Sequence, residues 1–373
     1  CIATGNGSPL LANDDVIIPA MISFGYEQND AYNYGVAACW EPLVPGKTFE
    51  FNNVCSINYV EPLIKLLNKS TDYKDYSSFV QEYLENLKKY VDREMHDKAS
   101  LTFNEDIVMS VFMPECREKR IDITEGALPY NHVGFTGVGM GSAVNSLLNI
   151  KKIVFEDDIY TLENIGRALK NNFERYTKMR QKMLHGKAKY GRDMEEVIAL
   201  TQKIVDAVEE CCKQNKTSLG GKFKFGLSSP SYIAAGEISG ATPDGRKNAE
   251  PFSTHISCAD GIAYTELLQF ASRLDYSGAK FNGNVVDFMV TPTFLRKNID
   301  KFVVFLKQSI KLGFFEMQMN VVDSETLIAA KKNPEAFPNL IVRVWGFSAY
   351  FKDLPDEYKD VLIKRAIQAE QAA

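Results

Sequence analysis

The chain has 373 residues, of which 45% are hydrophobic and 24% charged, as in globular proteins with a sizeable core. Its net charge of −5 and pI of about 5.6 exclude the basic balance of a protein that binds nucleic acid or an anionic membrane. It has neither an apolar run long enough to cross a bilayer nor the N-terminal pattern of a signal peptide, so we expect a cytoplasmic protein of one or two domains.

The cysteines and histidines do not form a metal-binding pattern. The seven cysteines lack paired C-x-x-C spacing, and the four histidines are scattered without an H-E-x-x-H pair. We therefore expect reduced thiols and no zinc or iron–sulfur site in this chain.

The chain starts at Cys1 without an initiator Met, and its first residues resemble the middle of a domain. A turn-forming run, Thr4–Pro9, comes before the short apolar segment Val16–Ile18. We expect this chain to be part of a longer protein.

A cysteine follows the short helix expected at Asn29–Gly35. Small and apolar residues lead into Cys39, and Pro42 and Pro45 stop regular structure directly after it. This pattern predicts a thiol at the tip of a loop, facing a cavity. The alternative is a buried inert thiol, which is the commoner fate of free cysteines.

Helical periodicity dominates the next part of the chain. Apolar residues recur at three- and four-residue spacing from Ile57 to Glu94, which predicts amphipathic helices. Thr161 is expected to cap another helix, and Cys211 and Cys212 lie on a further amphipathic helix.

The glycine-rich run Gly134–Gly141 could be interpreted as a phosphate-binding turn. Its spacing is not G-x-G-x-x-G, and we expect no βαβ unit around it, so we reject dinucleotide binding.

Turns, helices and strands alternate towards the C-terminus. Pro243-Asp244-Gly245 predicts a tight turn, which in isolation would lie at the surface. The remaining expected elements are a helix at Ile299–Ile310, a strand at Phe314–Val322, a strand at Leu340–Val344 and a final helix at Asp356–Ile367.

The stretch Arg343–Phe351 places Gly346 among β-branched and aromatic residues. A glycine there often marks a bulge or a close approach of the backbone. Alternatively, a glycine Cα without a side chain can host a radical, which the flanking amide and carbonyl delocalise.

Three motifs in order resemble those of the glycyl radical enzymes. They are the loop that ends in Cys39-Trp40-Glu41-Pro42, the run Gly240–Arg246 followed by Glu250-Pro251, and the stretch around Gly346. The resemblance extends from about Gly5 to the last helix.

This resemblance implies an α/β fold, the ten-stranded α/β barrel of two five-stranded halves, surrounded by many helices. The chain would be mainly its C-terminal half. Residues 1–235 would form part of the pyruvate formate-lyase-like barrel domain with the Cys loop, and residues 236–373 the glycyl radical domain. A homodimer is implied, in the cytoplasm or within a bacterial microcompartment.

The resemblance also implies roles for individual residues. A separate radical S-adenosylmethionine activating enzyme would modify Gly346 to a glycyl radical, the only cofactor expected, with no metal or dissociable organic cofactor in this chain. Gly346 would oxidise Cys39 to a thiyl radical that attacks a small-molecule substrate. Glu41 would act as a general base, and Phe281 and Asn282 would bind substrate.

The Cys loop also bears on the reaction. Pyruvate formate-lyase has two adjacent cysteines, whereas Ala38 precedes Cys39 here, which disfavours formate C-acetyltransferase chemistry. Glu41 is typical of the dehydratase and lyase branch, which predicts elimination from a small hydroxylated compound. Decarboxylation of an aryl acetate and a catalytically inactive, truncated scaffold subunit remain as alternatives.

Overall fold

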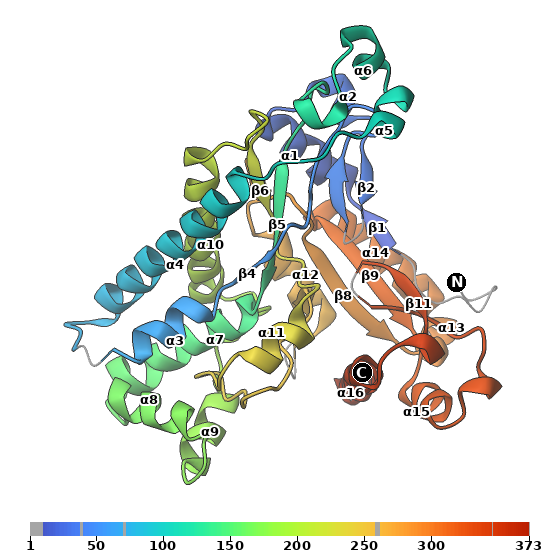
Figure 1. The fold of residues 1–373 in the computed structure, drawn as a ribbon. Coiled ribbons are helices and arrows are strands. Elements are labelled where there is room, and N and C mark those ends of the chain that lie inside the picture. Colours follow the sequence, from blue (N-terminus) through green and yellow to red (C-terminus); the bar gives the residue numbers. More distant parts are fainter. Residues whose placement is uncertain (1–9, 38–39, 70–71, 258–261, 345, 373) are drawn as a thin grey trace.

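The computed structural model describes residues 10–37, 40–69, 72–257, 262–344 and 346–372, and Figure 1 shows their arrangement. Its strands are β1 (Leu10–Ala12), β2 (Gly35–Ala37), β3 (Glu41–Leu43), β4 (Ser56–Asn58), β5 (Val133–Val138), β6 (Phe223–Phe225), β7 (Ile256–Ser257), β8 (Val285–Val290), β9 (Glu316–Val321), β10 (Ile341–Arg343) and β11 (Ser348–Tyr350).

Helices surround these strands. The helices are α1 (Asp14–Phe24), α2 (Gln28–Ala31), α3 (Glu61–Leu67), α4 (Tyr76–Ala99), α5 (Ile107–Phe112), α6 (Pro114–Lys119), α7 (Met140–Ile150), α8 (Leu162–Lys170), α9 (Thr177–Leu184), α10 (Glu195–Gln214), α11 (Tyr232–Ile238), α12 (Tyr264–Ser272), α13 (Pro292–Lys297), α14 (Ile299–Leu312), α15 (Ser324–Lys332) and α16 (Asp356–Ala372). Short 3-10 or π segments lie at Ile123–Glu125, Lys151–Glu156, Pro334–Ala336 and Phe351–Asp353.

Two parallel sheets form the centre of the molecule. One has the order β4-β5-β6, and the other has the order β1-β9-β8-β7, in which only β1 is antiparallel to its neighbour. Backbone hydrogen bonds from β6 to the segment before β8 join the sheets, since Phe225 N donates to Ala279 O at 2.8 Å and Asn282 N donates to Phe225 O at 2.9 Å. The strands therefore line one continuous interior wall.

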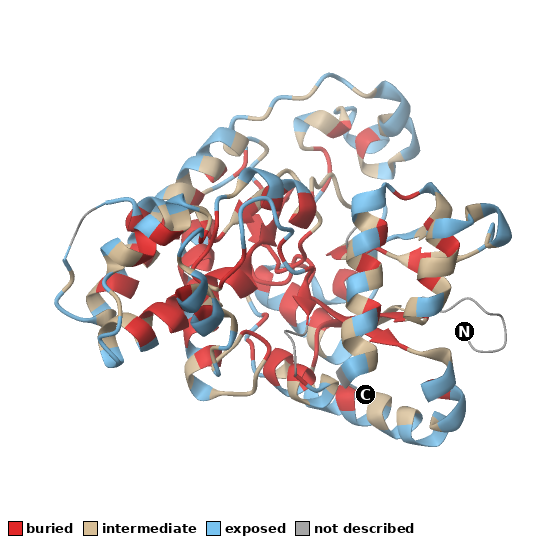
Figure 2. Cartoon of the chain, turned by 90° about the horizontal axis from the view of Figure 1, so that it is seen from below, coloured by how far each residue is buried: buried red, intermediate tan, exposed pale blue. Residues whose placement is uncertain are grey.

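The main core lies between these strands and the helices. Buried residues gather on the strands, while the outer faces of the helices are exposed (Figure 2). Strand β8 faces two cores: Phe288 packs in the main core, whereas Met289 belongs to a second, smaller core.

That second core belongs to the C-terminal module, which we define as residues 324–372. It consists of α15, the antiparallel pair β10–β11 and α16, and α16 packs against β8 (Figure 1). Its interior includes Val342, Phe351 and Leu362. An ion pair of 2.6 Å between Arg365 and Asp287 connects α16 to the sheet.

Several predicted elements are confirmed, among them the helices in residues 57–94, the cap at Thr161, the strand β9 and the final helix. Ile57 is an exception, because it lies in β4, where pairing with β5 outweighs the helical pattern. The Pro-Asp-Gly turn forms with Gly245 at φ 93°, but Pro243 and Gly245 are buried, since α9 packs over the turn.

The expectation that no βαβ unit surrounds Gly134–Gly141 is wrong. Strand β5 leads through Gly139 into α7, and β6 then returns parallel to β5. Glycines serve packing here, because a Cβ at Gly137 would lie 2.8 Å from the Tyr59 ring. No helix in the described ranges is long and apolar enough to span a membrane.

Candidate active site

One face of β9 carries a row of buried polar side chains. Glu316, Gln318 and Asn320 alternate along the strand with Met317 and Met319, which pack in the main core. Successive side chains of a strand point to opposite faces, so the three polar groups share the interior face. Each is at most 1% exposed.

Asn320 holds the strand that leads to the predicted radical glycine. Its Oδ1 accepts a hydrogen bond of 2.7 Å from the backbone N–H of Arg343, and its Nδ2 donates one of 2.9 Å to the carbonyl of Arg343. The strand β10 then pairs with β11 in the register Arg343 opposite Ser348. Gly346 therefore lies in the turn of an anchored hairpin.

The geometry of Gly346 fits a position that requires glycine. Its φ is 86°, in the region that residues with a Cβ rarely adopt, and the residue is buried. Its N–H donates to Gln318 Oε1 at 3.4 Å. The turn is closed by a bond of 3.1 Å from Val344 N to Phe347 O.

The predicted cysteine loop connects β2 and β3. These strands pair with Ala37 opposite Glu41, and Trp40 N donates to Ala37 O at 2.7 Å. Trp40 has a φ of 71°, which is unusual for a large side chain. Cys39 and Ala38 lie outside the described residues.

The two loops contact each other through Arg343 and Trp40. The Arg343 guanidinium carbon lies 5.9 Å from the centroid of the Trp40 ring, within the range of a cation–π interaction. Trp40 is the neighbour of Cys39 in sequence, and Arg343 comes three residues before Gly346. Segments from opposite ends of the chain thus meet at the interior face of β9.

Glu41 is fully buried at the start of β3, and a buried lysine supports this strand. Lys224 Nζ donates to the carbonyl of Pro42 at 2.9 Å and pairs with Glu50 at 2.6 Å. Burial lowers the pKa of Lys224, against the opposing charges of Glu50 and Glu41. A cation therefore lies within electrostatic reach of Glu41.

Glu316 is the other buried carboxyl group of this region. Burial raises the pKa of Glu316 well above its ordinary value, against the hydrogen bond from Asn284 N, and the negative charge of Glu41 raises it further. The Asn284 bond to Oε2 is 3.3 Å long. This environment therefore favours the neutral carboxylic acid form of Glu316.

The predicted substrate-binding residues lie in the loop between α12 and β8. Phe281 packs against Phe24 at a ring distance of 5.1 Å, and Asn282 Nδ2 donates to Asn52 O at 2.7 Å. Asn282 Oδ1 has no hydrogen-bond partner within the described part of the chain, so one acceptor remains for a ligand. Substrate contact by both residues stays a prediction.

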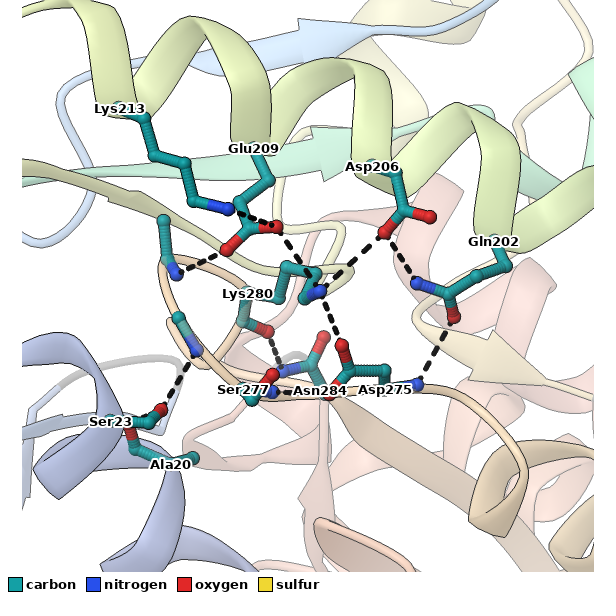
Figure 3. A network of polar contacts seen from close by, with 12 residues as sticks. Ala20, Ser23, Gln202, Asp206, Glu209, Lys213, Asp275, Ser277, Lys280 and Asn284 are labelled. Carbon is teal, nitrogen blue, oxygen red and sulfur yellow. Dashed lines mark hydrogen bonds and ion pairs between the residues drawn. The ribbon is translucent and has the colours of Figure 1, made fainter.

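An ion-pair network holds this loop against α10 (Figure 3). Lys280 lies between the helix and the loop, 3.2 Å from Glu209 and 2.5 Å from Asp275. Its carbonyl accepts a bond of 2.8 Å from Asn284 Nδ2. The network therefore also positions Asn284, whose backbone N–H donates to Glu316.

Sequence reasoning missed several residues of this site. The run Glu-Met-Gln-Met-Asn at 316–320 alternates polar and apolar residues, which is the signal of a strand with one polar face. Only the structure shows that this polar face is buried in the interior of the protein. Lys224 gave no such signal. Among the described residues, no three His, Cys, Asp or Glu side chains are grouped to hold a metal ion.

The structure is that of an α/β protein. The β10–β11 hairpin, which contains Gly346, contacts the loop between β2 and β3 next to the central, mainly parallel sheets. The pyruvate formate lyase-like family model matches residues 1–235, and the glycine radical model matches residues 252–352. The chain belongs to the pyruvate formate lyase-like family of glycyl radical enzymes and carries a glycine radical domain.

Relatives support the same assignment. A probable dehydratase of Escherichia coli (strain K12), YbiW, is 28% identical over 98% of this chain and 50% of its own length. The trans-4-hydroxy-L-proline dehydratase of Clostridioides difficile is 26% identical over 98% of this chain and 49% of its own length.

A solved structure has the same fold. The glycerol-bound B12-independent glycerol dehydratase from Clostridium butyricum is 28% identical and superposes with a TM-score of 0.87 over 97% of this chain and 49% of that chain. The expected fold class is thereby confirmed, and the described strands form part of the barrel. This chain spans about half the length of these relatives.

Proposed function

We propose that the complete gene product is a glycyl radical dehydratase or lyase that eliminates a leaving group from a small hydroxylated compound. The observation that carries this proposal is the Arg343–Trp40 contact of 5.9 Å, which joins the segment before Gly346 to the residue after Cys39. Hydrogen-atom transfer between a glycine and a thiol requires near contact of the two groups.

The reaction begins when an activating enzyme removes one hydrogen atom from Gly346. Gly346 then takes the hydrogen atom of the Cys39 thiol, which becomes a thiyl radical. The thiyl abstracts a hydrogen atom from the substrate carbon that bears a hydroxyl group. Burial of Gly346 and Glu41 excludes water and oxygen from these steps.

Elimination follows from the acidity of the substrate radical. Glu41 takes the hydroxyl proton, and the leaving group on the neighbouring carbon departs with its bonding electron pair. The product radical recovers a hydrogen atom from the Cys39 thiol, which restores the thiyl. For a diol with a hydroxyl leaving group, the products are an aldehyde or ketone and water.

The partners and the division of the chain belong to the same proposal. A radical S-adenosylmethionine activating enzyme acts on residues 236–373, the glycyl radical domain, while residues 1–235 provide barrel strands and the Cys loop. The protein works as a homodimer, in the cytoplasm or a bacterial microcompartment. The glycine radical model at residues 252–352 supports the need for an activating enzyme.

The compounds that appear in the names of related enzymes and solved structures provide a test panel. These compounds are glycerol, 1,2-propanediol, trans-4-hydroxy-L-proline and isethionate. The complete protein, activated without oxygen, is expected to consume one of these compounds, with loss of activity in Glu41→Gln but an unchanged radical signal. Exchange of labelled formate into pyruvate with no consumption of the panel would contradict the proposal.

A further inference from the structure

Glu316 occupies a distinctive place on the interior face of β9. It lies two positions before Gln318, which bonds the N–H of Gly346, and four positions before Asn320, which holds Arg343. Arg343 in turn contacts Trp40 of the Cys loop. The Glu316 carboxyl group therefore lies on the same face of β9 as the side chains that contact the Gly346 hairpin, to which the Cys loop is joined through Trp40.

The hydrogen bonding of Glu316 is incomplete. Oε2 accepts the bond from Asn284 N, whereas Oε1 is buried and has no hydrogen-bond partner among the described residues. A buried polar atom without a partner is costly, so natural proteins keep such atoms mainly where a ligand or a proton transfer uses them. Oε1 is thus available to a bound molecule.

Neighbouring charges separate the roles of the two glutamates. Lys224 interacts with the negative charges of Glu41 and Glu50. The pKa of Glu316 responds to burial, to the hydrogen bond from the Asn284 backbone N–H and to the negative charge of Glu41, and no lysine or arginine of the described residues is among these causes. Tyr34 and Tyr276, whose pKa values the charge of an ionised Glu316 would raise, are neutral phenols. The surroundings of Glu316 therefore favour its protonated form, whereas Glu41 has the Lys224 ammonium within electrostatic reach.

We propose that Glu316 is the proton donor to the leaving group and works as a pair with Glu41. This inference rests on the proposed elimination reaction, to which it adds the residue that makes the leaving group neutral. It also restricts the substrate class to compounds whose leaving group is basic enough to need a proton, such as a hydroxyl or an amine.

The proton balance of the pair closes over one turnover. Glu41 gains the proton of the substrate hydroxyl, and Glu316 loses its proton to the departing oxygen, which leaves as water with the electron pair of the broken carbon–oxygen bond. Return of the proton from Glu41 to Glu316 restores the starting state. No external acid, oxidant or reductant is consumed.

The first test needs no substrate. Glu316→Gln keeps an oxygen that accepts from Asn284 N–H but has no transferable proton. Infrared difference spectra of the complete protein at neutral pH are expected to show a protonated carboxyl band that is absent from this variant and retained in the exposed control Glu335→Gln. An unchanged band in Glu316→Gln overturns the proposal, because an ionised Glu316 cannot donate.

The second test separates this inference from the proposed function. With the panel compound that the parent consumes, Glu316→Gln is expected to retain the parent radical signal but to lose about 100-fold or more in kcat, the usual contribution of a general acid. In heavy water, the substrate recovered from the Glu316→Gln reaction is expected to contain deuterium, because the substrate radical that cannot eliminate takes back a hydrogen atom from the exchangeable Cys39 thiol. Turnover of Glu316→Gln at the parent rate overturns the inference, whereas absence of the radical signal from the parent protein contradicts the proposed function.

Discussion

Asn320 and Arg343 are joined by two hydrogen bonds, 2.7 Å from Arg343 N to Oδ1 and 2.9 Å from Nδ2 to Arg343 O. The side chain of one strand thereby satisfies both backbone groups of the residue at the end of β10. This pair fixes where the hairpin turn that contains Gly346 lies along β9.

Replacing Asn320 with Ala is expected to loosen the hairpin. Two partly buried backbone groups lose their partners, and each unsatisfied group costs about 1–3 kcal/mol. The free energy of unfolding of the C-terminal module, followed by hydrogen exchange, should fall, and the radical yield with it. Asn333→Ala, at an exposed position without a side-chain hydrogen bond to its helix, is the control. Equal effects of the two variants would contradict the anchoring role.

The Arg343–Trp40 contact can be measured with a double-mutant cycle. Arg343→Met and Trp40→Leu each remove one partner, and the coupling energy between them is expected to be about 0.5–2 kcal/mol, as for cation–π pairs. The readout is the free energy of unfolding of the complete protein. Strict additivity of the two substitutions would show that the loops do not depend on each other through this contact.

The ion pair between the partly buried Arg365 and the buried Asp287 is expected to hold α16 on the sheet. Arg365→Met leaves the fully buried Asp287 carboxylate unpaired apart from a 3.2 Å bond from Thr254, so the loss of stability should be about 3–5 kcal/mol. Chemical denaturation measures it. The double variant Arg365→Met with Asp287→Leu should recover much of this loss, and no recovery would contradict the electrostatic cause.

Glu316 gives the protein a characteristic pH dependence. Its folded pKa is raised above its unfolded value, so its contribution is fully present below about pH 4.5 and is lost as the pH rises towards the folded pKa. In that window, Glu316→Gln should gain stability relative to the parent by about 1.4 kcal/mol per pH unit. A stability difference that is constant with pH would contradict a neutral Glu316.

The sequence predicts the element types around the site well where the pattern is local. The helix periodicity of α4, the cap at Thr161 and the glycine in the hairpin turn all depend on near neighbours. Pairings between distant segments are not predicted in this way. Ile57, for example, follows a helical pattern in the sequence yet lies in β4 and pairs with β5. Local spacing cannot show such partners.

Two site features also depend on tertiary contacts alone. Lys224 becomes part of the site only because its ammonium reaches the Pro42 carbonyl, 182 positions away. The pKa of Glu316 depends on burial and on the charge of Glu41, a residue far from Glu316 in the sequence. Motif resemblance identified Cys39, Glu41 and Gly346 as candidates, but it carried no information on the wall of β9 that supports them.

The central claim, a radical on Gly346, is tested most directly by anaerobic electron paramagnetic resonance of the complete protein after treatment with an activating enzyme, S-adenosylmethionine and reductant. The matched control is Gly220→Ala, because Gly220 has a φ of 75° with open space around its Cβ position. That substitution therefore shares the backbone strain of about 1–2 kcal/mol with Gly346→Ala.

The account predicts a doublet signal in the parent and in Gly220→Ala, and its absence from Gly346→Ala. Deuteration of the glycine Cα should collapse the doublet, since the splitting arises from the remaining Cα hydrogen. A doublet that persists in Gly346→Ala would contradict the account.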